Sequence, residues 1–350
     1  MPKSETEHKA NSAIVISSRV RLARNLSGHK FVSSANKKQL AEVYAKCAQV
    51  LESSKKLAPA KLFNMERELE TTRALMVEDR TISKELDSAN SNLGAFISVD
   101  GSFSVFINEE DHIRIQTIGS GMCLSSLYKK ANAIDDELEK KLEFAFSSDI
   151  GYITSCPTNI GTGMRASVML HLPALSIENL IDKVVRGVNQ MGMAIRGANG
   201  EGSDSFNAFY QLSNQHTLGM TEEEIVKKIQ TFCKKICQFE QNARLKLLQE
   251  NPIVLLDKFM RARATLENCK LIDSDEALTN ISALRLAADM NLMKDSAKVI
   301  KKLDDISLCI LPSHMMIHFG LKGSQMQLRD EKRAKYLNEE ISRLPKIEMK

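Results

Sequence analysis

The mixture of strand-like and helix-like segments changes near residue 220, and this change constrains the fold more than any other feature of the chain. Before it, short runs of β-branched and aromatic residues alternate with stretches of helical periodicity. After it, a long amphipathic segment opens with a capping-box pattern, Thr221 to Glu224, and continues until Pro252. The sequence therefore predicts an α+β domain at residues 14–220 and a helical domain at residues 221–350.

Three segments of the first domain read as strands: AIVISSRV, GAFISVDGSFSVFIN and GYITSC. Asp100-Gly101 divides the second into two apolar runs, which indicates a tight hairpin. We therefore expect a largely antiparallel sheet flanked by helices rather than a doubly wound sheet. Apolar residues at helical spacing predict helices near residues 40–51, 180–188, 276–293 and 325–341.

Composition excludes several classes of protein. The 48 Lys and Arg residues are nearly balanced by 44 Asp and Glu residues, so the net charge of +4 does not indicate direct nucleic-acid binding. The polar N-terminus lacks a signal core and no apolar run is long enough to span a membrane, so we expect a cytoplasmic protein. The seven cysteines do not form paired CxxC motifs, so we expect reduced thiols and no metal site. His112 and His171 are expected to be structural.

Arginines recur beside glycine-rich and acidic motifs. Arg19, Arg21 and Arg24 lie at the end of the predicted strand IVISS, where alternation places Arg19 and Arg21 on the same face. Arg114 follows an acidic cluster and Arg165 a glycine loop, and Arg196 follows the run GMAI. The planar guanidinium binds phosphate oxygens bidentately and keeps its charge, so the set is compatible with a phosphate site. Each arginine alone is more often a surface or ion-paired residue.

Four segments together resemble the catalytic core of the guanidino phosphotransferases, the phosphagen kinase superfamily. They are SSRVRLARN at 17–25, NEEDHIRIQ at 108–116, IGYITSCPTNIGTGMRASVML at 150–170 and RGANGEGSD at 196–204. The resemblance spans about residues 14–340 and is closest to the bacterial protein-arginine kinases (McsB type). Met169 fits this branch, because the kinases of small substrates usually carry histidine there. So does the early first strand, since a helical domain precedes it in the animal enzymes.

The resemblance implies a phosphagen-kinase-like catalytic domain that binds ATP, with Mg²⁺ held through the nucleotide phosphates. Its implied nucleotide-binding residues are Ser17, Ser18, Arg19, Val20, Arg21, Arg114, Arg165, Ala166, Ser167, Val168, Met169, Arg196, Gly197, Ala198, Asn199, Gly200 and Glu201. One departure is Arg80, in MVEDRTIS, where the family usually has a histidine that contacts the nucleotide. Its effect on nucleotide preference stays open.

The acceptor implied by the family is a guanidinium, which has a pKa above roughly 12 and must lose a proton before it can attack. Carboxylates can orient it and accept that proton. By resemblance Glu110 and Glu201 take these catalytic roles, and Cys156 takes the position of a reactive cysteine near the guanidinium. Without the family, NEEDH would be read as a solvated acidic loop and Cys156 as a buried thiol at the end of a strand.

The segment RDEKRA near the C-terminus resembles the family's RDxxRA phosphoarginine-binding motif. Arg329, Asp330, Arg333 and Ala334 are the implied residues of an allosteric pocket, with the two arginines one turn apart on one helix. A solvated charged helix face would have the same pattern.

Together these features predict an ATP-dependent kinase that phosphorylates arginine side chains of proteins. The family implies that its products are marked for a Clp-type unfoldase-protease in the stress response. It also implies a zinc-containing activator protein and a homodimer. Two alternatives stay open: a kinase of free arginine or another small guanidino compound, and a catalytically silent phosphoarginine reader.

Overall fold

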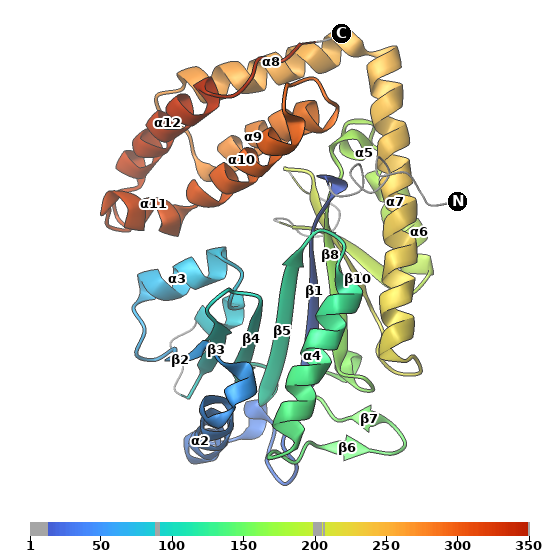
Figure 1. Cartoon of the computed structure of the whole chain (residues 1–350), viewed down its shortest axis with the longest axis vertical. Helices are drawn as coiled ribbons and strands as arrows, with labels where there is room; N and C mark the ends of the chain where they lie inside the picture. Colours follow the sequence, from blue (N-terminus) through green and yellow to red (C-terminus); the bar gives the residue numbers. More distant parts are fainter. Residues whose placement is uncertain (1–12, 88–91, 199–204, 206, 349–350) are drawn as a thin grey trace.

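The computed structural model describes residues 13–87, 92–198, 205 and 207–348, and its centre is an eight-stranded sheet (Figure 1). Every neighbouring pair of strands in this sheet is antiparallel. In their order across the sheet the strands are β2 Ala60–Asn64, β3 Gly94–Ser98, β4 Phe103–Ile107, β5 Ile113–Ser120, β1 Val15–Arg24, β8 Met164–His171, β10 Phe209–Asn214 and β9 Met193–Gly197. A separate hairpin pairs β6 Phe146–Ser147 with β7 Gly151–Tyr152.

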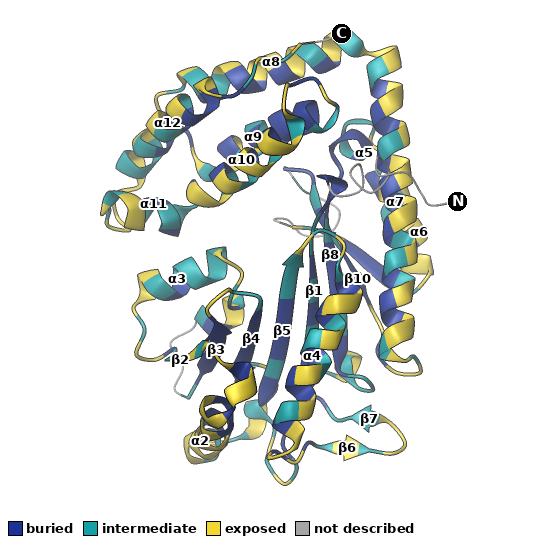
Figure 2. Cartoon of the chain, in the orientation of Figure 1, coloured by how far each residue is buried: buried dark blue, intermediate teal, exposed yellow. Residues whose placement is uncertain are grey.

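One face of the sheet is apolar and forms the main core. Val20, Ile115 and Val168 are fully buried in it, and the central strands are largely dark blue, the colour of buried residues, in Figure 2. Side chains of each strand alternate between this face and the opposite one. In β3 and β4 both faces are covered, and every residue is buried. The helices that precede residue 220 are α2 Lys37–Ser53, α3 Glu70–Glu78, α4 Leu124–Glu139, α5 Pro173–Ile177 and α6 Ile181–Gln190. Helix α4 packs against β1 and β5.

The opposite face is divided into two regions. Over β3 and β4 it is covered by a small second core, in which Met65, Leu86 and Phe106 are fully buried. Over β5, β1, β8 and β9 it carries arginines. On this face, apolar side chains therefore cover the sheet at β3 and β4, and arginines occupy the part that begins at β5.

The C-terminal helices form an arch from the end of the long helix α7 towards α3 (Figure 1). They are α7 Glu222–Glu250, α8 Pro252–Asn268, α9 Ser274–Asp289, α10 Ser296–Cys309, α11 Pro312–Phe319 and α12 Met326–Ser342. Helix α7 packs on β8 and β10. Helix α9 contacts the sheet at His171 of β8. The Nδ1 of His171 accepts from Arg285 at 3.2 Å, and its Nε2 lies 2.8 Å from the Ser282 hydroxyl. Burial and the nearby Arg285 hold the pKa of His171 well below its usual range, so it serves as a neutral link between β8 and α9.

The expected α+β fold, antiparallel sheet and helical C-terminal region are confirmed, and the hairpin at Asp100-Gly101 joins β3 to β4. Two local expectations were wrong. Arg19 and Arg21 lie within β1 rather than at its end, because β1 continues to Arg24. Most of GYITSC is a loop, because side chains bind its backbone: Asn25 donates to the Ile153 carbonyl, and Asp111 accepts from the Ser155 N–H.

The predicted capping box of α7 is present, with Thr221 accepting from the Glu224 N–H and the Glu224 carboxylate accepting from the Thr221 N–H. Thr221→Ala should therefore lower the free energy of unfolding by about 1 kcal/mol, measured by urea denaturation. Thr231→Ala is the matched control. Thr231 lies within the same helix and its hydroxyl only bonds the carbonyl one turn back, so a small or stabilising effect is expected. Equal losses in both variants would contradict the capping role.

Candidate active site

The strand register places five arginines on one face of the sheet. Arg21 lies directly opposite Arg165 on β8, and Ala23, two residues further along β1, lies opposite Arg114 on β5. Arg19 shares the face because it is two residues from Arg21. Arg196 of β9 lies on the same face, because Gln211 of β10 pairs both with Met169 of β8 and with Arg196. Strand alternation alone paired only Arg19 with Arg21, and the family resemblance implied the set of five. The register explains how the fold brings the five to one face.

Mutual repulsion and burial make this face electrostatically unfavourable as it stands. Burial, followed by Arg80, Arg165 and Arg114, lowers the pKa of Arg19 to about 10. Burial and Arg19 lower the pKa of Arg21 well below its usual range. Like charges directly opposite each other on neighbouring strands destabilise a sheet. A bound polyanion would offset the repulsion between the arginines, so the arrangement is suited to binding a polyanion.

The arginines of this face make only some of their possible hydrogen bonds to the rest of the protein. Arg19 donates to Gln211 at 3.2 Å, and Arg165 reaches Ser213 at 3.5 Å. The Nε of Arg165 is buried and has no partner among the described residues. A buried donor without a partner is costly unless a ligand accepts from it. Gln211 and Ser213 were missed from sequence, and their alternation along β10 was the available signal.

The residues of the NEEDH motif have separate positions. Glu109 is buried and accepts from Arg114 at 2.8 Å and from Ser83 at 2.6 Å, and burial raises its pKa against the effect of Arg114. Glu110 accepts from the other side of the same guanidinium at 2.5 Å but is 43% exposed. Of these two carboxylates, Glu110 is therefore the one that a substrate in solution can reach.

Asp111 and His112 organise the loops around the site. Asp111 is fully buried, and its Oδ1 accepts from Asn25 at 2.7 Å and from the Ser155 N–H at 2.6 Å. His112 accepts from the Leu26 N–H through Nδ1 at 3.0 Å, with Nε2 2.9 Å from a carbonyl oxygen. These bonds tie the end of β1 to the loop that carries Cys156, so Asp111 is a positioning residue.

Cys156 lies at the start of a short 3₁₀ turn, Pro157–Asn159, and is partly exposed. Its Sγ is 3.0 Å from the Thr158 hydroxyl. The Cys47 thiol is fully buried, and burial raises its pKa to about 12, so that thiol is inert.

The glycine loop after Cys156 packs closely against the segment that follows β10. Gly161 has φ +112°, and a Cβ at this position would lie 2.6 Å from the Thr217 carbonyl oxygen. Only glycine fits such an approach. The loop therefore fixes the position of Cys156 relative to β8, which carries Arg165.

The other residues that were predicted to bind the nucleotide lie on one or the other face of the sheet, because side chains alternate along each strand. Ser17, Ser167 and Met169 lie on the arginine-bearing face. The side chains of Ser18, Val20, Ala166 and Val168 point to the opposite, core-facing side, so they cannot reach a ligand bound at the arginines. Gly197 ends β9 and Ala198 follows it. Asn199, Gly200 and Glu201 lie outside the described residues.

The motif on α12 combines buried and partly accessible residues. Arg333 is 1% exposed and donates to the carbonyls of Ile310 and Ile272 and to Asp330. Ala334 is also buried. Arg329 is half-buried, and its Nε is an interior atom without a partner among the described residues. Arg333 thus holds the helices together, whereas Arg329 retains a donor for a ligand.

Comparison with known proteins gives two family matches that cover most of the chain. Residues 42–243 match the catalytic domain of the ATP:guanido phosphotransferases, and residues 252–350 match the C-terminal domain of the protein-arginine kinase McsB. A protein-arginine kinase of Shouchella clausii is 37% identical over 95% of this chain and 92% of its own length. One of Syntrophomonas wolfei is 39% identical over 96% and 93%. The chain belongs to the protein-arginine kinase family.

Solved structures place this family member among the phosphagen kinases. Lombricine kinase superposes with a TM-score of 0.58 at 25% identity, over 66% of this chain and 67% of its own. A duplicated taurocyamine kinase from Schistosoma mansoni, with bound components of a transition-state analogue, gives 0.60 at 24% identity. It covers 85% of this chain and 49% of that one. The second comparison supports the fold alone.

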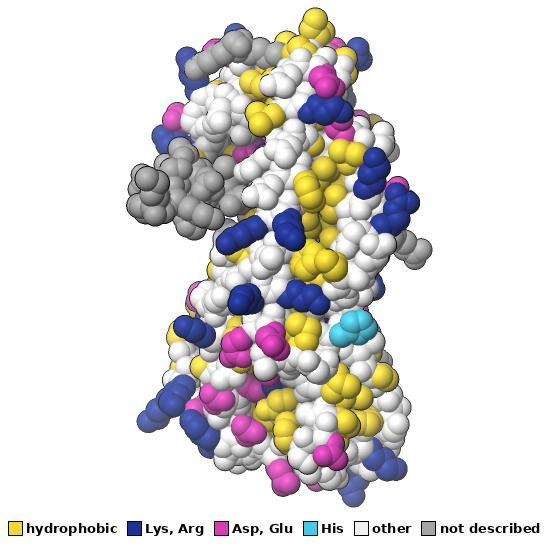
Figure 3. Space-filling model, turned by 90° about the vertical axis from the view of Figure 1, so that its right-hand side faces the viewer, with side chains coloured by type: hydrophobic (Ala, Val, Ile, Leu, Met, Phe, Trp, Pro, Cys, Tyr) yellow, Lys and Arg dark blue, Asp and Glu magenta, His cyan; other side chains and the backbone are white. Residues whose placement is uncertain are grey.

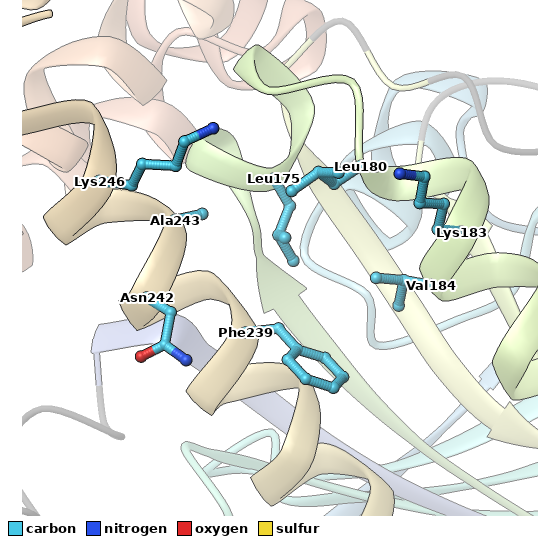
Figure 4. Close-up of a pocket in the computed structure, with 8 residues that line it drawn as sticks. All are labelled: Leu175, Leu180, Lys183, Val184, Phe239, Asn242, Ala243 and Lys246. Atoms are coloured by element: carbon cyan, nitrogen blue, oxygen red, sulfur yellow. The ribbon is translucent and has the colours of Figure 1, made fainter. Parts of the chain in front are cut away.

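A separate groove of about 460 Å³ lies between α5, α6 and α7 of this kinase-family chain (Figure 4). Phe239, Val184 and Leu175 point into it, with Lys183 and Lys246 at its rim. Figure 3 shows hydrophobic side chains flanked by basic ones on this side of the molecule. None of the residues that line it belongs to the arginine-bearing face, so it is distinct from the candidate active site.

Within residues 13–87, 92–198, 205 and 207–348, no group of three His, Cys, Asp or Glu residues is arranged to hold a metal ion. In the same residues, none of the helices has the length and apolarity that crossing a bilayer requires.

Proposed function

We propose that this chain is an ATP-dependent protein-arginine kinase, which transfers the γ-phosphate of ATP to arginine side chains of proteins. The observation that carries the proposal is the cross-strand pair Arg21 and Arg165, set among three further arginines and next to Glu110. A cationic face of this kind stabilises the charge that spreads over a transferring phosphoryl group. The family relationship supports the same reaction.

The arginines fit the phosphates of a nucleotide, because Arg165 has a buried donor left to make a further bond. In the proposed reaction a guanidinium nitrogen of the substrate attacks the γ-phosphorus in line. The N–P bond forms as the bond from phosphorus to the β–γ bridging oxygen breaks, and ADP leaves with that electron pair. Glu110 accepts the proton that the guanidinium loses, and Cys156 stabilises the substrate cation before transfer. The nucleotide phosphates would hold Mg²⁺, which would neutralise part of their charge.

The proposal extends to the biological role that the family resemblance implies. Phosphorylated proteins would be directed to a Clp-type unfoldase-protease in the cytoplasm during stress, with a zinc-containing activator protein and a homodimeric kinase. Arg329 would bind phosphoarginine at the motif on α12, supported by its unpartnered Nε. Glu201 would share substrate binding with Glu110.

The test is to incubate the purified chain with Mg·ATP and an unfolded model protein, and to map phosphorylation by mass spectrometry. Non-acidic conditions are needed because the P–N bond is acid-labile. Phosphoarginine on the protein is the expected result. ATP consumption with free arginine, but no modified protein, would indicate a kinase of small guanidino compounds.

A silent phosphoarginine reader is separated from a kinase by Glu201→Ala. Under the proposal this variant loses phosphorylation but still binds a phosphoarginine peptide. If the wild-type chain binds that peptide but phosphorylates nothing, even with the activator added, the chain is a reader and the kinase proposal fails.

A further inference from the structure

The C-terminal helical domain contacts the end of α3 through direct hydrogen bonds. The two carboxylate oxygens of Glu78, the last residue of α3, accept from the Ser313 N–H at 2.8 and 3.0 Å. One of them also accepts from the His314 N–H at 3.2 Å. A carboxylate at the first turn of a helix satisfies unpaired N–H groups and interacts favourably with the helix dipole. Glu78 therefore caps α11 from another domain.

The next residue, Asp79, strengthens the same contact. Its Oδ1 lies 2.9 Å from Nε2 of His314. Two consecutive acidic residues of the catalytic domain thus bind two consecutive residues of the C-terminal domain. We refer to this set, Glu78, Asp79, Ser313 and His314, as the α3–α11 contact.

Arg80 follows this contact directly and is also tied to the active-site face. Its backbone is left-handed, with φ +59°, which turns the chain sharply. Its carbonyl oxygen accepts from Gln116 at 3.1 Å, and Gln116 lies opposite Arg21 in the sheet. Arg80 is therefore held on one side by the C-terminal domain and on the other by the arginine-bearing face.

The charge of Arg80 acts on the same cluster. After burial, Arg80 is the strongest of the groups that lower the pKa of Arg19. Desolvation lowers the pKa of Arg80 itself, although the residue as a whole is exposed, and Asp304 on α10 opposes that shift. Arg285 donates to Asp304 at 2.8 Å. The charge of Arg80 thus interacts both with the sheet arginines and with a carboxylate of the C-terminal domain.

We propose that the α3–α11 contact positions Arg80 as an additional cation for the polyphosphate of the nucleotide, so that the C-terminal domain controls nucleotide affinity. The inference rests on the proposed function, since it deepens the nucleotide site described there. Arg80 would contact phosphate, and Glu78 acts only through it as a positioning residue. Displacement of α11 would withdraw Arg80 from the site without altering the five sheet arginines.

The test is a double-mutant cycle on equilibrium binding of Mg·ADP, measured by calorimetry. Arg80→Ala should raise the Kd roughly tenfold, as expected for loss of one charge-assisted bond. Glu78→Ala should raise it about threefold to tenfold, because Arg80 is released rather than removed. The double variant should bind no more weakly than Arg80→Ala, since contacts that act through one group are not additive.

Glu70→Ala is the matched control, because Glu70 is an exposed residue in the first turn of the same helix. It should leave the Kd unchanged. Glu78→Gln, which keeps one carbonyl acceptor for α11, should fall between wild type and Glu78→Ala and guards against a variant that does not fold. Thermal melting of each variant establishes that it is folded.

Two outcomes would overturn the inference: a Kd for Glu78→Ala equal to that of Glu70→Ala, or fully additive effects of Glu78→Ala and Arg80→Ala. Binding of ADP does not require a guanidino substrate, so the test is independent of which acceptor is phosphorylated. A wild-type chain that binds Mg·ADP but yields no phosphoarginine would defeat the proposed function alone. A wild-type chain that does not bind Mg·ADP would overturn both.

Discussion

Arg21→Met is expected to lower kcat/KM for protein phosphorylation by roughly a thousandfold, the lower end of the range for an arginine that stabilises phosphoryl transfer. Methionine retains much of the aliphatic stem but removes the charge. The physical reason is the position of Arg21, at the centre of the face and directly opposite Arg165. Rates would be measured with Mg·ATP and an unfolded protein substrate.

The same substitution should not weaken the fold. Because Arg21 is crowded by Arg19 and opposed by Arg165, removing its charge relieves repulsion, and the free energy of unfolding should stay equal or rise by up to about 1 kcal/mol. Arg186→Met on α6 is the matched control, since Arg186 is exposed and lies outside the arginine-bearing face. An active Arg21→Met variant, or one that unfolds more easily, would show that Arg21 serves the fold instead.

Glu110→Gln should lower kcat by about a hundredfold to ten-thousandfold while leaving the affinity for Mg·ADP within about twofold. Glutamine preserves the shape and one acceptor for Arg114, but it cannot neutralise a substrate guanidinium or take its proton. The measurement combines turnover of the protein substrate with calorimetric nucleotide binding.

Glu143→Gln is the control for this change, because Glu143 is exposed in the loop after α4. It should behave as wild type in both measurements. If Glu110→Gln weakened nucleotide binding as much as turnover, its role would be to hold Arg114 rather than to act on the acceptor.

The fold class and some of the elements could be predicted because they depend on local patterns. β-Branched residues identified β1, and the Asp100-Gly101 turn identified the β3–β4 hairpin. Helices α3, α4, α5, α8, α10 and α11 were not predicted. Pro252 was read only as the end of α7, whereas proline is also favoured in the first turn of a following helix, as in α8.

The composition of the site was predictable from motifs, but its geometry was not. Strand alternation relates Arg19 to Arg21 within one strand, but the pairing of Arg21 with Arg165 spans the length of the domain. Such a register depends on tertiary packing. Arg80 was recognised in the sequence only as a departure from the family. Its place beside Arg19 depends on a left-handed turn and on contacts with a C-terminal helix.

Because the arginines share one face of the sheet, insertions and deletions in β1 and β8 are constrained during evolution. Insertion or deletion of one residue between Ser17 and Arg24 of β1, or within β8, would turn the later side chains of that strand to the other face unless a local irregularity absorbed it, such as the register shift between Val15 and Ser17. Guanidinium groups would then enter the main core, and valine or leucine would take their places on the arginine-bearing face. Point substitutions can alter the arginines one at a time, whereas a change of one residue in the length of either strand would alter several together.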